Sequence, residues 1–490
     1  MPKESLEINP AGIRLSKKST VPLYQQLYDQ FRNMLLNNRL RPGDRLPASR
    51  NLSKELGVSR VIINQAYEQL IMEGYLVGKT GAGTFVADVL PDHLLNVKPV
   101  GTKKKAPVDN TIATTPLVEA GSRSPIKPFQ SGTPSLDLFP YKAWQQVGNT
   151  VLKDLKSLHL GYEDTLGLWP LRNAIAAYLR MSRAVSCEAE QVVVVTGSQQ
   201  GLNLIAATLL QKGDKVWMED PGYHGARHAF EANNATICPV PMETDGLNID
   251  DAIQKFGAAK IAYITPSHQF PLGYTLSHEK RLQLLQYAQQ NNMVILEDDY
   301  DSEFRYKGNP LPSLQGLDTA GTVIYSGTFS KVLFPGLRLA YLVLPTAAMI
   351  NRFKIIKDNL DRQSPIIEQA TLCRFMEQGY FQRHIRKMRL LYAERQQLLL
   401  ALIKEQLGDY ATVKPVASGM HVVCWLSPKI HPGKLQAAAK QHGLIITPVN
   451  NYSLQHTIPA GITLGFTAFS KYKLKTGVAL LAQCIQEALY

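Results

Sequence analysis

The sequence predicts a multidomain protein, with a small and mostly helical N-terminal domain, a large α/β domain and a smaller α/β C-terminal subdomain. The chain has 490 residues, about three times the length of a typical domain. Residues 20–87 have helical periodicity and end in a Gly-rich turn. From residue 129 onward, short apolar runs alternate with amphipathic stretches, as in α/β domains.

The composition is that of a globular protein with excess positive charge. Hydrophobic residues make up 45% of the chain and charged residues 19%, which excludes a disordered or fibrous protein. The formal net charge of +13 suggests a polyanionic partner, but only a small part of the excess lies before residue 90. Charge alone therefore does not identify a DNA-binding protein.

The sequence also argues against a disulfide-rich, zinc-thiolate, membrane-spanning or secreted protein. Its five cysteines are widely spaced and include no CxxC pair, which argues against a disulfide framework and a thiolate zinc site. No apolar run is long enough to span a bilayer, and the first residues lack the apolar region of a secretory signal. We therefore expect a cytoplasmic protein without a metal and without a membrane partner.

Three helices and a hairpin are predicted for the N-terminal domain, residues 18–87. Apolar residues recur at helical spacing over 21–38, at Leu23, Leu27, Phe31, Met34 and Leu35. Pro47 opens a second helix that stops at Gly57, and Ser59 is well placed to cap a third. Two short helices around a Gly-containing turn form a helix-turn-helix, and VGKTGAGTFV can form a wing. The spacing alone fits any three-helix bundle equally well.

The string that runs from Arg41 to Val86 resembles the winged helix-turn-helix domain of GntR-type bacterial regulators over its whole length. The resemblance implies that this domain binds a double-stranded DNA operator. It implies phosphate or base contacts from the starts of the second and third helices, and a minor-groove contact from the wing. The residues that it implies for DNA binding are Arg50, Arg60, Ser49, Ser59, Asn64, Gln65 and Lys79.

Two further regions follow the predicted winged domain. Residues 88–127 are rich in Pro, Thr and Lys without sustained periodicity, which predicts a flexible linker. Residues 128–490 form the predicted α/β domain, with a small subdomain from about residue 350. Its strand-like runs are 191–195, 215–219, 259–265, 292–298 and 322–327. Because several are nearly all apolar and alternate with helical stretches, they predict a parallel sheet that is buried on both faces.

The segment SGTFSKVLFPGLR has the composition of a site for an amine nucleophile beside a phosphate. Lys331 follows a predicted strand, and a lysine that forms a Schiff base needs a partly desolvated site. Thr328, Ser330 and Arg338 supply the hydroxyls and the cation that a phosphate needs. A lone Ser-Lys pair, however, is more often a surface feature.

Three other segments carry residues for binding a flat, phosphorylated cofactor. In EDDYDSEF, Asp298 ends a predicted strand, where a carboxylate can hold a pyridine nitrogen protonated, and Tyr300 can bond a phenolic oxygen. Ser198 and Gln199 begin a helix after a strand and a Gly turn, a ready anion site. Tyr223 follows the next strand, where it can stack on a ring. Each segment alone is more often structural than functional.

From residue 129 onward the chain resembles the fold type I, aspartate-aminotransferase-like, pyridoxal-phosphate (PLP) proteins. The segments that carry this resemblance are FQSGTPSLDLFP, GYEDTLGLWPLRNAIAAYL, TGSQQGL, EDPGYHGAR, EDDYDSEF and SGTFSKVLFPGLRLAYL. With the winged head, the whole chain resembles the MocR/GabR-type transcription regulators. The resemblance implies PLP as cofactor in an aldimine with Lys331, Asp298 on the pyridinium nitrogen, Tyr300 on the ring oxygen and Tyr223 stacked on the ring. The phosphate ligands implied are Ser198, Gln199, Thr328, Ser330, Arg338 and, from the partner subunit of a homodimer, Tyr162.

Two departures from the aminotransferase pattern bear on activity. In TPSHQFPLG, Phe270 stands where aminotransferases have an asparagine that bonds the cofactor, and His268 nearby is read as a structural histidine that could partly substitute for it. In GITLGF, Thr463 stands where many aminotransferases have the arginine that clamps the substrate carboxylate. Without that clamp, a carboxylate substrate loses both orientation and binding energy.

These features predict a PLP-binding, DNA-binding transcription regulator that senses PLP or an amine or amino-acid effector through Lys331. The missing clamp favours PLP over an amino acid. The alternative is a catalytically competent PLP-dependent aminotransferase with an accessory DNA-binding domain. A third possibility is a dimerisation scaffold that has lost PLP. We expect transamination to be at most weak or limited to a half-reaction.

Overall fold

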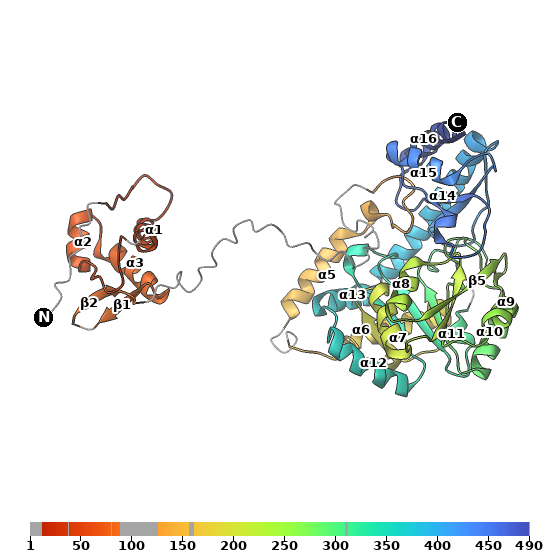
Figure 1. Cartoon of the computed structure of the whole chain (residues 1–490), viewed down its shortest axis with the longest axis horizontal. Helices are drawn as coiled ribbons and strands as arrows, with labels where there is room; N and C mark the ends of the chain where they lie inside the picture. The colour runs from red at the N-terminus through yellow and green to blue at the C-terminus, as the bar shows by residue number, and fades with distance from the viewer. Residues whose placement is uncertain are drawn as a thin grey trace. The chain divides into compact units, whose positions relative to one another are not determined.

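The computed structural model describes residues 12–37, 39–79, 81–88, 126–155, 161–308 and 312–489. The chain divides into two units, Met1–Ser122 and Arg123–Tyr490, which are described separately (Figure 1). Most of the predicted linker, 88–127, lies outside the described residues. In the described part of the chain, no helix is long and apolar enough to cross a membrane.

The described residues of the first unit form three helices and a two-stranded hairpin. Its elements are α1 (Leu23–Leu36), α2 (Ser49–Leu56), α3 (Arg60–Met72), β1 (Leu76–Lys79) and β2 (Gly83–Val86). The strands pair antiparallel as the predicted wing. The apolar face of α1 is buried as its spacing predicts, and the ring of Phe31 packs edge-on against Tyr67 of α3, with centroids 5.6 Å apart. Gly57 ends α2 with φ +61°, a backbone angle that glycine adopts without strain.

The second unit is built on an eight-stranded sheet in the order β3-β10-β9-β8-β7-β4-β5-β6. The strands are β3 (Val192–Val195), β4 (Lys215–Asp220), β5 (Thr236–Glu243), β6 (Gly246–Leu247), β7 (Ile261–Ile264), β8 (Val294–Asp299), β9 (Val323–Thr328) and β10 (Ala340–Val343). The strands from β9 to β5 run parallel. The five strands that the sequence predicts, β3, β4, β7, β8 and β9, all run in one direction. The sheet is mixed because β10, which was not predicted, is antiparallel to β3 and β9, and β6 is antiparallel to β5.

Helices cover both faces of this sheet. The helices are α5 (Tyr141–Asp154), α6 (Trp169–Arg183), α7 (Ser198–Leu209), α8 (His224–Ala232), α9 (Ile249–Phe256), α10 (His278–Gln290), α11 (Leu314–Leu317), α12 (Ala347–Leu360) and α13 (Ile366–Glu377). Successive side chains of a strand point to opposite faces. In β4, Met218 packs with α7 and α8, while Trp217 packs with α9 and α10. Both faces are therefore buried, as the apolar runs predict.

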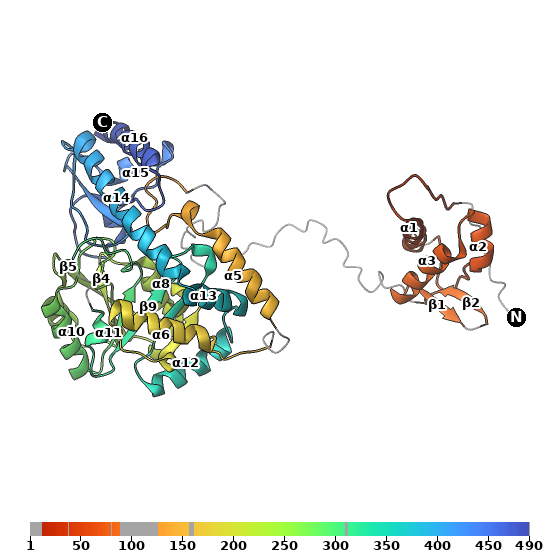
Figure 2. The same cartoon turned by 180° about the vertical axis from the view of Figure 1, so that it is seen from behind.

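The C-terminal part contains a second sheet, in the order β11-β12-β14-β13. Its elements are α14 (Tyr380–Leu407), β11 (Ala411–Val413), β12 (His421–Leu426), α15 (Pro432–Gln441), β13 (Thr447–Pro448), β14 (Gly461–Gly465) and α16 (Lys471–Leu489). The residues from about 350 onward first form α12 and α13, which pack on α5, α6 and α7. The long α14 then contacts α13 and also α16 and β11, so that it joins the two parts (Figure 2).

His384 of α14 makes stability depend on pH. Its side chain is buried and packs edge-on against Phe139, with ring centroids 5.8 Å apart. Burial lowers the pKa of His384 from 6.5 to about 4. Between pH 6.5 and about pH 4, the unfolded chain therefore binds a proton at His384 that the folded chain does not bind. The folded state consequently loses stability relative to the unfolded chain as the pH falls through 6.5.

We expect His384→Gln to reduce the loss of stability that accompanies acidification. Between pH 7 and pH 5, the unfolding free energy of the variant should fall by about 2 kcal/mol less than that of the wild type. Urea unfolding of both proteins at the two pH values measures the difference. Identical pH dependence in the two proteins would mean that His384 is not the group responsible.

Candidate functional site

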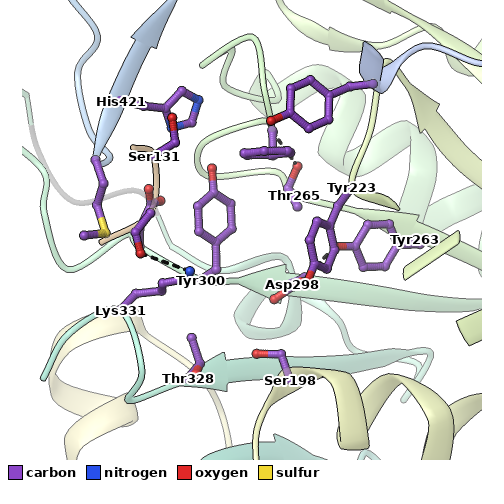
Figure 3. Close-up of a pocket in the computed structure, with 15 residues that line it drawn as sticks. Ser131, Ser198, Tyr223, Tyr263, Thr265, Asp298, Tyr300, Thr328, Lys331 and His421 are labelled. Atoms are coloured by element: carbon purple, nitrogen blue, oxygen red, sulfur yellow. Dashed lines mark hydrogen bonds between the residues drawn. The ribbon is translucent and has the colours of Figure 1, made fainter. Parts of the chain in front are cut away.

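A pocket of about 200 Å³ lies at the carboxyl ends of β7, β8 and β9 (Figure 3). In open α/β sheets, ligands collect at this edge. Asp298 comes from the end of β8 and Thr328 from the end of β9, while Ser198 is the first residue of α7. The predicted residues that line the pocket are Ser198, Tyr223, Asp298, Tyr300, Thr328 and Lys331.

The amine of Lys331 enters the pocket from the turn that follows β9. Its Nζ donates a hydrogen bond to the carbonyl oxygen of Gly132, 3.0 Å away (Figure 3). Burial lowers the pKa of Lys331, while the carboxylates of Asp301 and Asp298 oppose that shift. Desolvation favours the neutral amine, which is the nucleophilic form.

Asp298 presents one satisfied and one unsatisfied oxygen. The hydroxyl of Tyr263 donates to Oδ2 at 2.7 Å, whereas Oδ1 is buried and has no partner among the described residues. Burial raises the pKa of Asp298 to about 6. A buried oxygen of this kind needs a hydrogen-bond donor, and a ligand with a cationic N–H would supply one.

A guanidinium lies beside the start of α7, and the turn after β9 offers a hydroxyl that is unsatisfied among the described residues. Gly197 precedes this helix with φ +124°, and a Cβ there would lie 2.7 Å from a guanidinium nitrogen of Arg338. Ser330 Oγ is buried without a partner among the described residues, and the backbone N–H of Ser330 donates to Thr328 Oγ1 at 3.2 Å. Helix N-termini with a nearby guanidinium favour anions such as phosphate.

Aromatic side chains form much of the remaining wall. Tyr223 and Phe270 pack edge to face, with ring centroids 6.1 Å apart. The Tyr300 hydroxyl donates to the carbonyl oxygen of His268 at 3.1 Å and lies 3.0 Å from His268 Nδ1. His268 is buried, and its Nδ1 lies 3.1 Å from a carboxylate oxygen of Asp301. The wall therefore combines aromatic rings with the hydroxyl of Tyr300, which contacts His268, and His268 in turn contacts the carboxylate of Asp301.

In the first unit, the predicted DNA-binding residues lie at the surface around α2, α3 and the wing. Arg60 Nε donates to Ser49 Oγ at 3.1 Å, which links the starts of α3 and α2. Ser59 immediately precedes α3, but its hydroxyl makes no capping hydrogen bond. The remaining residues, Arg50, Asn64, Gln65 and Lys79, are exposed. A concavity between α2, α3 and the wing is lined by Ser49 and Asn64 and also by Arg45.

Comparison with known proteins gives matches to both units. The family model for bacterial regulatory proteins of the gntR family matches residues 23–86, and that for aminotransferase class I and II matches residues 129–464. The probable rhizopine catabolism regulatory protein MocR of Rhizobium meliloti is 35% identical over 95% of this chain and 94% of its own length. The chain belongs to the MocR-type GntR regulators.

Other relatives agree with this assignment. The pyridoxine biosynthesis transcriptional regulator PdxR of Corynebacterium glutamicum is 30% identical over 97% of this chain and 98% of its own length. The kynurenine aminotransferase of Pyrococcus horikoshii, solved with PMP, has a TM-score of 0.69 and 28% identity over 75% of this chain and 92% of its own. This MocR-type protein is therefore a helix-turn-helix transcriptional regulator with an aminotransferase-like domain, and the fold indicates a PLP-type cofactor.

Four of the predicted cofactor-binding residues are not among those that line the pocket of this MocR-type regulator: Gln199, Ser330, Arg338 and Tyr162. Gln199 donates instead to the carbonyl oxygen of Gly225 at 2.8 Å. Tyr162 is 79% exposed, and the guanidinium of Arg362 lies 4.5 Å from its ring centroid. Thr463 is buried in β14, where its hydroxyl faces the carbonyl oxygen of Thr447. Among the described residues that line the pocket, Lys331 and His421 have basic side chains, and burial lowers the pKa of His421 to about 4.

Several residues that line the pocket of the MocR-type regulator were not predicted from the sequence. Tyr263 lies within β7 and reads as a core residue, although its hydroxyl holds Asp298. Gly132 lies in the segment FQSGTPS, which carries part of the family resemblance, but no local pattern pairs it with Lys331. His421 and Tyr452 come from the C-terminal part, far from the recognised segments. Only the folded chain brings these residues together.

Proposed function

We propose that this regulator holds PLP at Lys331 and uses it to sense a small molecule that changes operator binding. When bound, PLP supplies an aldehyde that reacts with amines and a ring that withdraws electrons. The observation that carries the proposal is a pair of unsatisfied buried atoms: Asp298 Oδ1, from a residue that lines the pocket together with Lys331, and Ser330 Oγ, from the residue that precedes Lys331. Asp298 Oδ1 can accept a hydrogen bond from the N–H of the pyridine ring, and the hydroxyl of Ser330 can donate one to a phosphate oxygen.

The residues around the pocket have separable roles in this proposal. Lys331 forms the covalent link through its amine, and Asp298 accepts the proton of the ring nitrogen. Tyr300 bonds the ring oxygen, and Tyr223 stacks on the ring. The phosphate ligands proposed are Ser198, Gln199, Thr328, Ser330 and Arg338. The Arg338 guanidinium beside Gly197 supports the position of this phosphate site.

The effector that we favour is PLP itself. A carboxylate-bearing effector would need a positively charged partner. Among the described lining residues, the cofactor uses Lys331, and burial lowers the pKa of His421 to about 4, so that its imidazole is neutral near pH 7. Thr463 is not among the residues that line the pocket, and it has no charge. The name of the relative PdxR, a pyridoxine biosynthesis regulator, agrees with this choice.

DNA binding by the winged unit completes the proposal. Arg50, Arg60, Ser49, Ser59, Asn64, Gln65 and Lys79 supply the contacts to phosphates and base edges. The protein acts as a homodimer in which Tyr162 of one subunit reaches the phosphate site of the other. The high exposure of Tyr162 agrees with a role at a subunit interface. Effector binding then changes the operator affinity of the two tethered heads.

Trapping of the covalent link tests the proposal. The full-length protein is incubated with PLP, reduced with borohydride and digested, and the peptides are analysed by mass spectrometry. We expect one pyridoxyl group per chain, on Lys331. Label spread over exposed lysines, or no label, would overturn the proposal. The rival, an efficient aminotransferase, predicts many turnovers with common amino acids, whereas we expect at most a single half-reaction.

We expect Gly197→Ala to weaken PLP binding at least tenfold. The new methyl group would occupy space 2.7 Å from the Arg338 guanidinium and displace it from the start of α7. Loss of a charge-assisted hydrogen bond has about this effect. Equilibrium titration of absorbance with PLP measures the affinity.

Gly213→Ala is the matched control for this prediction. Gly213 also has a positive φ, +88°, but a Cβ there meets nothing within 4 Å. Both variants carry backbone strain, yet only Gly197→Ala displaces Arg338. Equal loss of PLP affinity in the two variants would mean that strain, and not the phosphate site, is responsible.

A further inference from the structure

A second cavity, of about 170 Å³, lies between α6, α14 and the segment that follows β8. It adjoins the cofactor pocket in sequence, because Asp301 lines the first pocket and Ser302 lines the second cavity. Neither PLP binding nor DNA binding, as proposed above, uses this cavity.

Three buried polar atoms in the cavity lack a partner among the described residues. They are Ser302 Oγ, Glu303 Oε2 and Arg305 Nε. Ser302 is 7% exposed and Glu303 is 8% exposed, so that water reaches them only through the cavity. Buried polar atoms normally have partners. The cofactor pocket also contains a buried polar atom without a partner among the described residues, Asp298 Oδ1, and the unpartnered atoms of the second cavity likewise indicate a ligand.

The cavity also has an excess of positive charge. Arg183 pairs with Asp299 at 2.8 Å. By contrast, no carboxylate in the described part of the chain lies within salt-bridge distance of Arg305 or Arg389. Arg389 Nε donates to the carbonyl oxygen of Glu303 at 3.0 Å, and among the described residues its two terminal nitrogens have no hydrogen-bond partner.

Glu303 cancels only part of this charge near neutral pH. Its Oε1 accepts a long hydrogen bond, 3.3 Å, from the hydroxyl of Tyr178. Burial, followed by the nearby charge of Asp299, raises the pKa of Glu303 to about 7. Near neutral pH this side chain is therefore partly protonated, and it can then donate a hydrogen bond to an anion.

We propose that this cavity binds a small oxyanion, such as a phosphate group, through Arg305, Arg389 and the hydroxyl of Ser302. Guanidinium groups bind phosphate through paired hydrogen bonds, and a serine hydroxyl supplies a further donor. Inorganic phosphate and the phosphate group of a small ester share this chemistry.

The position of the cavity connects it with the cofactor pocket. The backbone N–H of Tyr306 donates to the carbonyl oxygen of Ala417 at 2.8 Å, and the backbone N–H of Gly419 donates to the carbonyl oxygen of Phe304 at 3.0 Å. Met420 and His421, which follow directly, line the cofactor pocket. An anion held by Arg305 therefore contacts the segment that carries residues of both sites. We expect anion binding and PLP binding to influence each other, reciprocally and by the same factor.

Calorimetric titration of the full-length protein with inorganic phosphate tests this inference. The protein carries Arg338→Gln so that the phosphate site of the cofactor pocket is disabled. We expect one phosphate to bind per chain. Adding Arg305→Gln should weaken the binding about tenfold or more, as loss of a charged hydrogen bond does. Arg389→Gln should act in the same way, and because Arg389 is exposed, this variant should fold normally.

Arg386→Gln is the matched control, because Arg386 is exposed on the same helix and does not line the cavity. It should leave phosphate affinity unchanged. The inference is overturned if Arg338→Gln alone abolishes phosphate binding. It is also overturned if Arg305→Gln, Arg389→Gln and Arg386→Gln all weaken the binding equally, or if no binding is seen at millimolar phosphate. Binding of both glycerol phosphate and phosphate indicates an ester as the ligand, and binding of phosphate alone indicates the free ion. The pattern across these variants can be read in protein with or without PLP, because the proposed coupling would change the phosphate affinity of all the variants and not which arginine the binding requires.

Discussion

Lys331→Ala is expected to abolish the covalent attachment of PLP and the visible absorbance that accompanies it. The substitution removes the one amine in the described lining of the pocket, and alanine cannot replace it as a nucleophile. The variant should stay folded, and dimeric if the protein forms the proposed homodimer, since the hydrogen bond that the lysine side chain makes among the described residues is the one to the carbonyl oxygen of Gly132. Absorbance after incubation with PLP, together with size-exclusion chromatography, measures both properties.

An exposed lysine provides the comparison for Lys331→Ala. Lys212 lies at the surface of the same unit, so Lys212→Ala should retain full absorbance and borohydride labelling. If Lys331→Ala kept a borohydride-stable label at the level of the wild type, another lysine would be the attachment site. Our assignment of the pocket would then be wrong.

Arg60→Ala is expected to weaken operator binding about tenfold or more without changing the cofactor absorbance. Arg60 begins α3 at the surface of the winged unit and is tied to Ser49 at the start of α2. In a homodimer the substitution removes two contacts, and a single arginine contact with a base is worth about 1–3 kcal/mol. Fluorescence anisotropy at physiological salt, with an operator that the full chain selects from random DNA, measures the affinity.

The effect of position must be separated from that of net charge. Arg352→Ala removes the same charge from an exposed site on α12 in the second unit, and should leave operator affinity nearly unchanged. Since DNA binding depends on salt, both variants are compared at the same ionic strength. Unchanged affinity in Arg60→Ala would contradict our placement of the recognition helix.

The sequence predicts the fold well where the pattern is local. The apolar runs of β4, β7, β8 and β9 are strands, and α1 buries the face that its spacing predicts. By contrast, β5 contains Pro239 and Pro241, which read as strand breakers. The structure tolerates them because β5 pairs with β4 on one side and meets β6 only through Met242 and Glu243. The direction of β10 depends on long-range pairing, which a local pattern does not reveal.

The residues of the site fall into the same two groups: those in local patterns, which the sequence predicts, and those brought together by long-range packing, which it does not. Residues next to a strand end or a helix start, such as Asp298, Thr328 and Ser198, lie in recognisable segments and line the pocket. Gly132 was missed because it meets Lys331 across 199 residues of chain. His421 was missed because the C-terminal sheet contributes it. Its position depends on how two parts of the second unit pack, which no spacing rule predicts.

Operator affinity, measured with and without PLP, tests most directly whether Lys331 couples the two units of this regulator. The wild type and Lys331→Ala are each freed of PLP, and operator affinity is measured before and after the vitamer is supplied at a saturating concentration. We predict that PLP changes the affinity of the wild type several-fold and leaves that of Lys331→Ala unchanged. An equal response in the two proteins, or none in the wild type, would contradict the account.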